Sequence, residues 1–109
     1  MSLDETLRKR VPQRFIIILG HRPEPEDTVL SFQTYVRDGQ AFVPIFDSVD
    51  ALRSAGGADG KPVFEMDRAV FISALNGTEP LVLNPSLLSE LSFRGSDLLR
   101  VFSNTSQAP

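Results

Sequence analysis

Apolar residues fall in short runs separated by turn residues, and the spacing of each run predicts its secondary structure. Five consecutive apolar residues, mostly β-branched, occupy Phe15–Leu19, which favours a strand buried on both faces at the centre of a sheet. Residues 30–36 alternate apolar and polar side chains, which predicts a strand with Phe32 and Val36 on its buried face. Asp38-Gly39 suits a tight hairpin turn, and residues 41–46 then return as the second strand.

Proline and capping residues fix other boundaries. Pro44 lacks an amide hydrogen, so we expect it at an edge, at a bulge or where its amide would face no neighbour. Ser2 and Glu5 have the spacing of a capping box, which predicts a helix over 3–10. Asp67 caps a helix over 68–75 that is apolar on almost every side. The other expected elements are helices over 48–55 and 96–102, strands over 62–66 and 81–83, and an extended piece around Phe93.

This order of elements predicts a single α/β (α+β) domain over residues 1–102. Its mixed sheet has about five strands, including the hairpin, and helices pack on it. The length of 109 residues and the 41% hydrophobic content fit one core. Residues 103–109 are expected to form a disordered tail.

Composition excludes several classes of function. The chain has no cysteine, which excludes disulfides, thiolate metal sites and a cysteine nucleophile. Its longest apolar run is too short to cross a membrane and no signal peptide is visible, so we expect a cytoplasmic protein without membrane contact. The net charge of −3 and the single tyrosine argue against nucleic-acid binding. Residues 1–22 carry five basic and two acidic side chains, which we interpret as a solvated face.

Catalytic motifs are weak. His21 is the only histidine, and it is either a general base oriented by the acidic residues of the 24–27 segment or an exposed residue at a strand end, which we favour. Gly56–Lys61 is glycine-rich and ends in lysine, but Pro62 follows where a phosphate loop has a hydroxyl residue. We therefore expect no catalytic residue, no metal and no cofactor.

Two apolar motifs carry a family resemblance. "FVPIFDSVDAL" at residues 42–52 and "LVLNP" at residues 81–85 resemble the SseB (enhanced serine sensitivity) N-terminal domain family over about residues 40–85. Family members typically have threonine at Asp47 and often have glycine at Ser86. The resemblance implies a small bacterial α/β domain that serves as an accessory or interaction module, and it brings no established catalytic residues.

The first functional hypothesis is a protein-interaction domain with an unknown protein partner. Binding residues tend to lie on loops held by a rigid scaffold, which here are the turns after two strands and the proline-rich loop. Either Asp47 or Ser48 caps the helix that follows the first of these strands, and Asn84 can bond backbone groups two residues further on. The expected surface comprises Asp47, Ser48, Asn84, Pro85, His21 and Arg22.

The alternative hypothesis is a small-molecule sensor or enzyme. In it, His21, Arg22 or Arg94 would hold an anionic ligand in a pocket at strand ends. The apolar helix over 68–75 leaves the oligomeric state open, because it suits either burial within a monomer or the contact of a homodimer.

Overall fold

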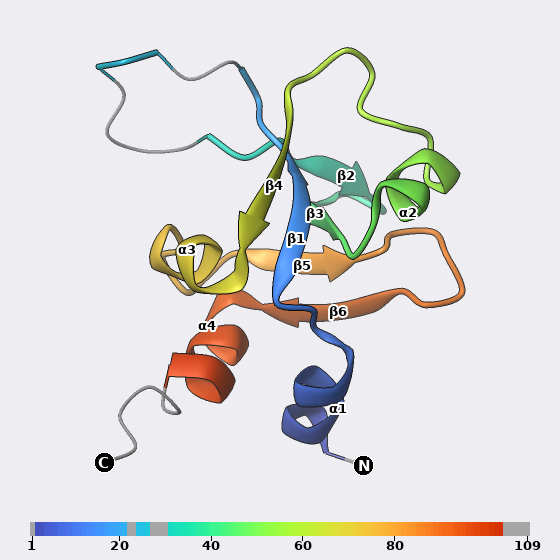
Figure 1. Ribbon diagram of the computed structural model, residues 1–109. Coiled ribbons are helices and arrows are strands. Elements are labelled where there is room, and N and C mark those ends of the chain that lie inside the picture. The colour runs from blue at the N-terminus through green and yellow to red at the C-terminus, as the bar shows by residue number, and fades with distance from the viewer. Residues whose placement is uncertain (1, 22–23, 27–30, 104–109) are drawn as a thin grey trace.

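The computed structural model describes residues 2–21, 24–26 and 31–103, which contain both helices and strands (Figure 1). The elements are α1 Leu3–Arg10, β1 Arg14–Ile18, β2 Tyr35–Arg37, β3 Gln40–Phe46, α2 Val49–Ser54, β4 Val63–Asp67, α3 Arg68–Ser73, β5 Pro80–Leu83, β6 Leu91–Arg94, α4 Gly95–Leu98 and the π-helical turn η1 Leu99–Ser103. The tail expected at 103–109 lies almost wholly outside the described residues.

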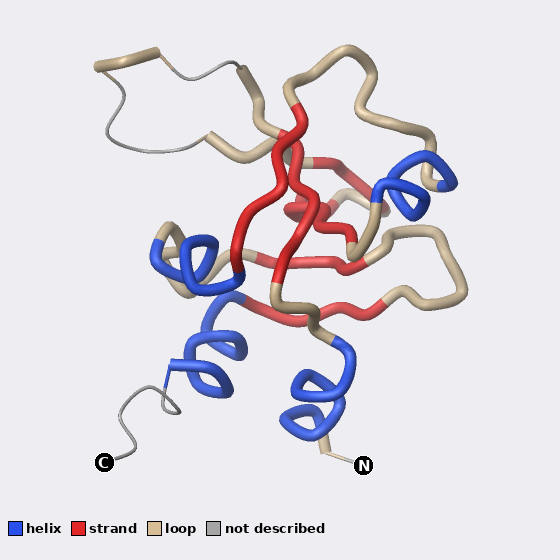
Figure 2. Tube along the Cα trace, viewed as in Figure 1, coloured by secondary structure: helices blue, strands red, loops and turns tan. Residues whose placement is uncertain are grey.

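The strands form one six-stranded mixed sheet in the order β4-β1-β3-β5-β6, with β2 paired to β3. The pair β3–β5 is parallel and the other pairs are antiparallel. Helices α1, α3 and α4 lie to one side of the strands and α2 to the other (Figure 2). This confirms the predicted α+β class. The prediction that β1 is central was wrong, because β1 lies beside the edge strand β4 and β3 occupies the middle.

Both faces of β1 are buried, as its uninterrupted apolar run predicts. Phe15 and Ile17 belong to the larger core, which includes residues of α1, α3 and α4. Ile16 and Ile18 belong to a smaller core on the face that α2 covers. Both faces of β1 are therefore buried because helices cover both sides of the sheet, although β1 is not its central strand.

The hairpin confirms the predicted turn but corrects the predicted face. Asp38 and Gly39 have φ of 54° and 80°, the pair of positive values that a two-residue hairpin turn needs. Val36, however, is 71% exposed, while the Tyr35 ring packs edge-on against Phe42 with 6.0 Å between ring centroids. The alternation shifts because Phe32 bridges to Leu19, directly after β1, and the chain joins β3 only from Tyr35.

Along one side of β3 the neighbouring strand changes from β2 to β1, and Pro44 lies at this change. This confirms the expectation that its backbone nitrogen faces no partner. On that side, β3 pairs with β2 up to Phe42 and with β1 from Ile45. The carbonyl of Ile18, which would face Pro44 if this register continued, instead accepts a hydrogen bond of 2.9 Å from the amide of Gln33. A residue without an N–H thus fits a central strand at this one point.

The predicted cap of α1 is confirmed, but that of α3 is wrong: Asp67 precedes α3, and its side chain pairs with Arg14 instead of capping the helix. The helix expected over 96–102 is α4 followed by the π-helical turn η1. The hydroxyl of Ser2 accepts from the amide of Glu5 at 3.2 Å, which confirms the cap of α1. Helix α3 ends at Ser73, two residues early; it buries Phe71 and Ile72, while Val70 is half exposed. Phe71 and Ile72 therefore pack within the domain, which is one of the two roles expected of this helix, while Ala69 and Val70 are exposed.

A tight corner joins the segment after α3 to the start of α4. The amide of Gly95 donates to the carbonyl of Glu79 at 2.9 Å, and the amide of Ser96 donates to the carbonyl of Gly77 at 2.7 Å. A Cβ atom at Gly95 would lie 2.6 Å from Oε1 of Glu79 and 3.2 Å from Cα of Gly77. A side chain at position 95 would therefore crowd both Glu79 and the backbone of Gly77, so glycine suits this close approach.

Candidate functional site

The parallel pairing of β3 and β5 brings Asp47 and Asn84 together. Each residue directly follows its strand, and the carboxyl ends of parallel neighbours meet at one edge of the sheet. Oδ1 of Asn84 accepts from the amide of Asp47 at 3.2 Å, and Nδ2 of Asn84 donates to Oδ2 of Asp47 at 3.1 Å and to Oγ of Ser89 at 3.0 Å. Both amide hydrogens and the carbonyl oxygen of Asn84 are thus used.

Asn84 is only 2% exposed and adopts φ of 52°, a left-handed conformation that asparagine tolerates better than most residues. Its backbone amide also donates to the carbonyl of Ile45 at 2.8 Å. The sequence suggested that its side chain bonds backbone groups two residues further on. It reaches Asp47 and Ser89 instead, so it ties two strand ends together.

The other residues of the predicted turns have structural roles. Ser48, rather than Asp47, caps α2, because its hydroxyl accepts from the amide of Ala51 at 3.0 Å. Pro85 is buried. Asp47 is exposed and is held in place by Asn84, so it is the one carboxylate of these turns that the solvent reaches.

The segment Asn84–Glu90, called the 84–90 loop, is fixed at its far end as well. Oε1 of Glu90 accepts from the amide of Ser86 at 2.7 Å, and the Arg37 guanidinium donates to both carboxylate oxygens of Glu90 at 2.8 and 2.9 Å. The Arg37 hydrogen bonds, followed by that of Ser86, lower the pKa of Glu90 below its ordinary value. The Arg10 guanidinium donates to the carbonyl of Ser89.

Leu88 stands out on this loop because its side chain is fully exposed, at 110% of the reference area. Beside the loop, a small hollow of about 240 Å³ is lined by the three residues of β2, by Phe42 of β3, by Ala55 directly after α2, and by Pro85 and Ser86. Val36, 71% exposed, forms part of its rim. The wall residue Tyr35 has a raised pKa, first because it is partly buried and then because Asp59 is near. Leu88 belongs to no periodic pattern, so no feature of the sequence singles it out.

The structure does not bring His21 to this edge. Because β1 runs antiparallel to β3, the end of β1, which His21 follows, lies at the opposite end of the strands from Asp47. Arg22 lies outside the described residues. Arg94 pairs with Pro80 at the start of β5, and its side chain donates to the carbonyl of Thr78 at 3.2 Å.

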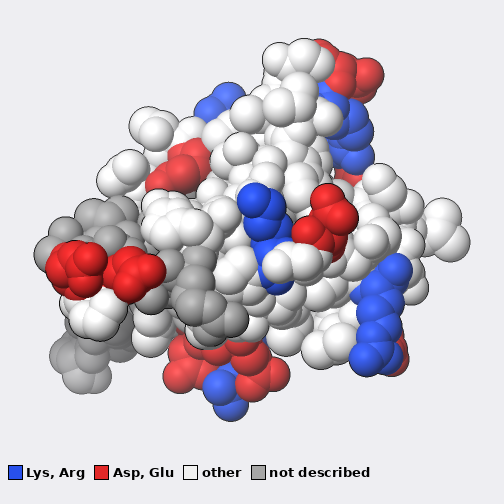
Figure 3. Space-filling view, turned by 90° about the horizontal axis from the view of Figure 1, so that it is seen from above, with Lys and Arg blue, Asp and Glu red and all other residues white. Residues whose placement is uncertain are grey.

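Electrostatic and metal-binding features are sparse. Basic and acidic side chains are interspersed on the face seen in Figure 3, where they form no continuous basic patch. Within residues 2–21, 24–26 and 31–103, no three histidine or acidic side chains gather closely enough to hold a metal ion. In the same part of the chain, every helix is too short or too polar to cross a membrane.

Comparison with known protein families gives one match. The family model for the SseB protein N-terminal domain matches residues 5–100 of this sequence. The chain belongs to the SseB N-terminal domain family. No curated protein and no solved structure matches it. In this SseB domain Ser86 has φ of 69°, a value at which glycine is unstrained and serine is not.

Proposed function

We propose that this SseB domain is a protein-interaction module that binds its partner through the 84–90 loop. The observation that carries the proposal is the fully exposed Leu88 on a loop whose two ends are fixed. A single exposed leucine is common on protein surfaces. Leu88 is better suited than most to fill a pocket on a partner, because the buried Asn84 and the bidentate Arg37–Glu90 ion pair hold its loop in place.

The fixed loop supports this role because it reduces the entropy lost on binding. Ordering a flexible loop at an interface opposes association, whereas a loop already held in its bound shape avoids much of that loss. Asn84 holds the start of the loop to β3, and Glu90 holds its end to β2 through Arg37. Ser86 keeps its positive φ between them, and backbone strain of this kind gathers at binding sites.

The surroundings of Leu88 indicate the chemistry of the partner. The hollow beside the loop accommodates one apolar side chain, and the exposed Val36 extends its apolar rim. Asp47 and Asp50 add carboxylates at the start of α2. We infer a partner that offers an apolar pocket for Leu88, an apolar side chain for the hollow and a basic group for these carboxylates.

Affinity capture from the cells that make the protein tests this proposal. The tagged wild-type domain is compared with Leu88→Ser, which removes the anchor, and with Val63→Ser as a matched control. Val63 is 40% exposed and lies on the edge strand β4, away from the 84–90 loop. The proposal predicts a protein captured by the wild type and by the control, and at least tenfold less of it with Leu88→Ser. Equal capture by all three would refute it.

A further inference from the structure

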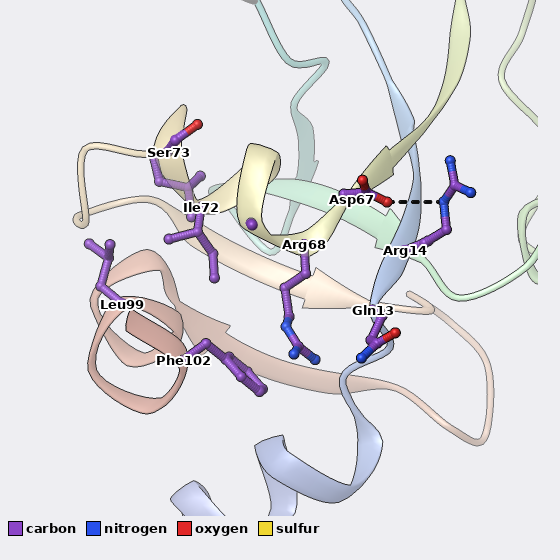
Figure 4. A pocket seen from close by; sticks show the side chains of 10 residues that line it. Gln13, Arg14, Asp67, Arg68, Ile72, Ser73, Leu99 and Phe102 are labelled. Carbon is purple, nitrogen blue, oxygen red and sulfur yellow. Dashed lines mark ion pairs between the residues drawn. The ribbon is translucent and has the colours of Figure 1, made fainter. Parts of the chain in front are cut away.

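A larger hollow, of about 840 Å³, opens between α3, η1 and the amino end of β1 (Figure 4). It shares no lining residue with the 84–90 loop. One end is polar and includes the side chains of Gln13 and Arg68, while Ile72, Leu75 and Leu99 line the rest. The volume lies within the range of small-molecule sites, which combine an apolar wall with a few polar groups.

Arg68 is the cation that this hollow leaves without a counter-charge. Its guanidinium lies 4.0 Å from the centroid of the Phe102 ring, and its Nη1 is 3.4 Å from the carbonyl oxygen of Val11 and 3.5 Å from that of Pro12. Within the described part of the chain, Arg68 forms no ion pair, and its Nε and Nη2 donate no hydrogen bond. Burial lowers the pKa of Arg68, which still remains charged at neutral pH.

The other charged groups at the rim pair with one another: the single cation Arg14 lies between two carboxylates, so together they carry one net negative charge. Nε of Arg14 is 3.2 Å from Oδ1 of Asp67, and Nη2 of Arg14 is 3.1 Å from Oε1 of Glu65. Figure 4 shows the Arg14–Asp67 pair turned away from the apolar wall, whereas Arg68 extends toward Phe102 and Gln13. The side chain of Gln13 makes no hydrogen bond with the described residues, so its amide is available beside Arg68.

We propose that this hollow binds a small amphipathic carboxylate. The carboxylate would accept hydrogen bonds from the free Nε and Nη2 of Arg68, whose planar fork matches its two oxygens, and from the amide of Gln13. The hydrocarbon body would lie along Ile72, Leu75 and Leu99. A single uncompensated cation favours a monoanion over a phosphate dianion, because the second negative charge would have no partner.

Titration of the ¹⁵N-labelled domain with sodium octanoate, followed by NMR, tests the site. Acetate keeps the charge without the hydrocarbon, and octanol keeps the hydrocarbon without the charge. We expect saturable shifts at the amides of residues 68–75 with octanoate, and binding at least tenfold weaker with acetate and with octanol. Shifts of equal size with octanol, or none near the hollow with octanoate, would overturn the proposal.

Three variants locate the binding. Arg68→Gln removes the cation, and we expect it to weaken octanoate binding by a factor of about ten to one hundred. Ala69→Trp fills the hollow from an exposed position of α3 and leaves Arg68 intact. It should abolish octanoate binding, and it tests the site even if Arg68→Gln fails to fold. Arg53→Gln, on the exposed side of α2, is the control and should bind as the wild type does. Unchanged binding by folded Ala69→Trp would overturn the proposal.

Discussion

Replacing Asn84 by alanine removes the link between the ends of β3 and β5. The change deletes three side-chain hydrogen bonds and leaves the part-buried amide of Asp47 without its acceptor. Exposed Asp47 and Ser89 can turn to water, so most of the loss comes from that amide, at about 2 kcal/mol. Alanine at φ of 52° costs about 1 kcal/mol more. Asn84→Ala should therefore lower the free energy of unfolding by about 3 kcal/mol.

Asn84→Gly separates the two contributions. Glycine also lacks the side chain, but it adopts a positive φ without steric cost. It should be about 1 kcal/mol less destabilising than alanine at this position. Urea unfolding followed by circular dichroism at 25 °C measures both variants against the wild type. A loss of less than about 0.5 kcal/mol for both variants would refute the claim that Asn84 holds these strand ends together.

Other substitutions and pH test further parts of the account. Ser86→Gly should stabilise the domain by about 0.5–1 kcal/mol in urea unfolding, because serine is strained at φ of 69°; a destabilisation would contradict this. Gly95→Ala should destabilise it by about 1–3 kcal/mol, because a Cβ meets the backbone of the tight corner; an unchanged melting temperature would argue against that contact. The folded-state pKa of Glu90 is below its ordinary value of 4.5, so its contribution to stability is complete above that value and is lost as pH falls through the lowered pKa. Glu90→Gln should therefore be less stable near neutral pH and lose less stability on acidification; parallel pH profiles would refute this role.

The sequence predicts features that depend on a few neighbouring residues. Ser2 and Ser48 cap helices as expected, since a hydroxyl bonds an amide three residues away. The turn at Asp38-Gly39 follows for the same reason, because both residues tolerate positive φ. Such local preferences act whatever the rest of the chain does.

The sequence does not predict features that depend on distant pairing. Asn84 was expected to bond near itself, but its partner Asp47 is 37 positions away and meets it only because β3 and β5 are parallel. The exposed face of Val36 was mispredicted because the chain changes strand partner between residue 32 and Tyr35. Nothing in the pattern distinguishes Leu88 from the half-buried Leu87 before it. The predicted turns therefore lie next to the proposed binding loop, whereas its exposed Leu88 could be found only from the structure.

Photocross-linking from position 88 tests the proposed interaction surface most directly. A photoreactive phenylalanine analogue replaces Leu88 in one sample and Val63 in another, and both are irradiated in the cells that make the protein. The account predicts one discrete covalent protein adduct from position 88 and none from position 63. Adducts of equal yield from both positions, or from position 63 alone, would contradict the assignment of binding to the 84–90 loop.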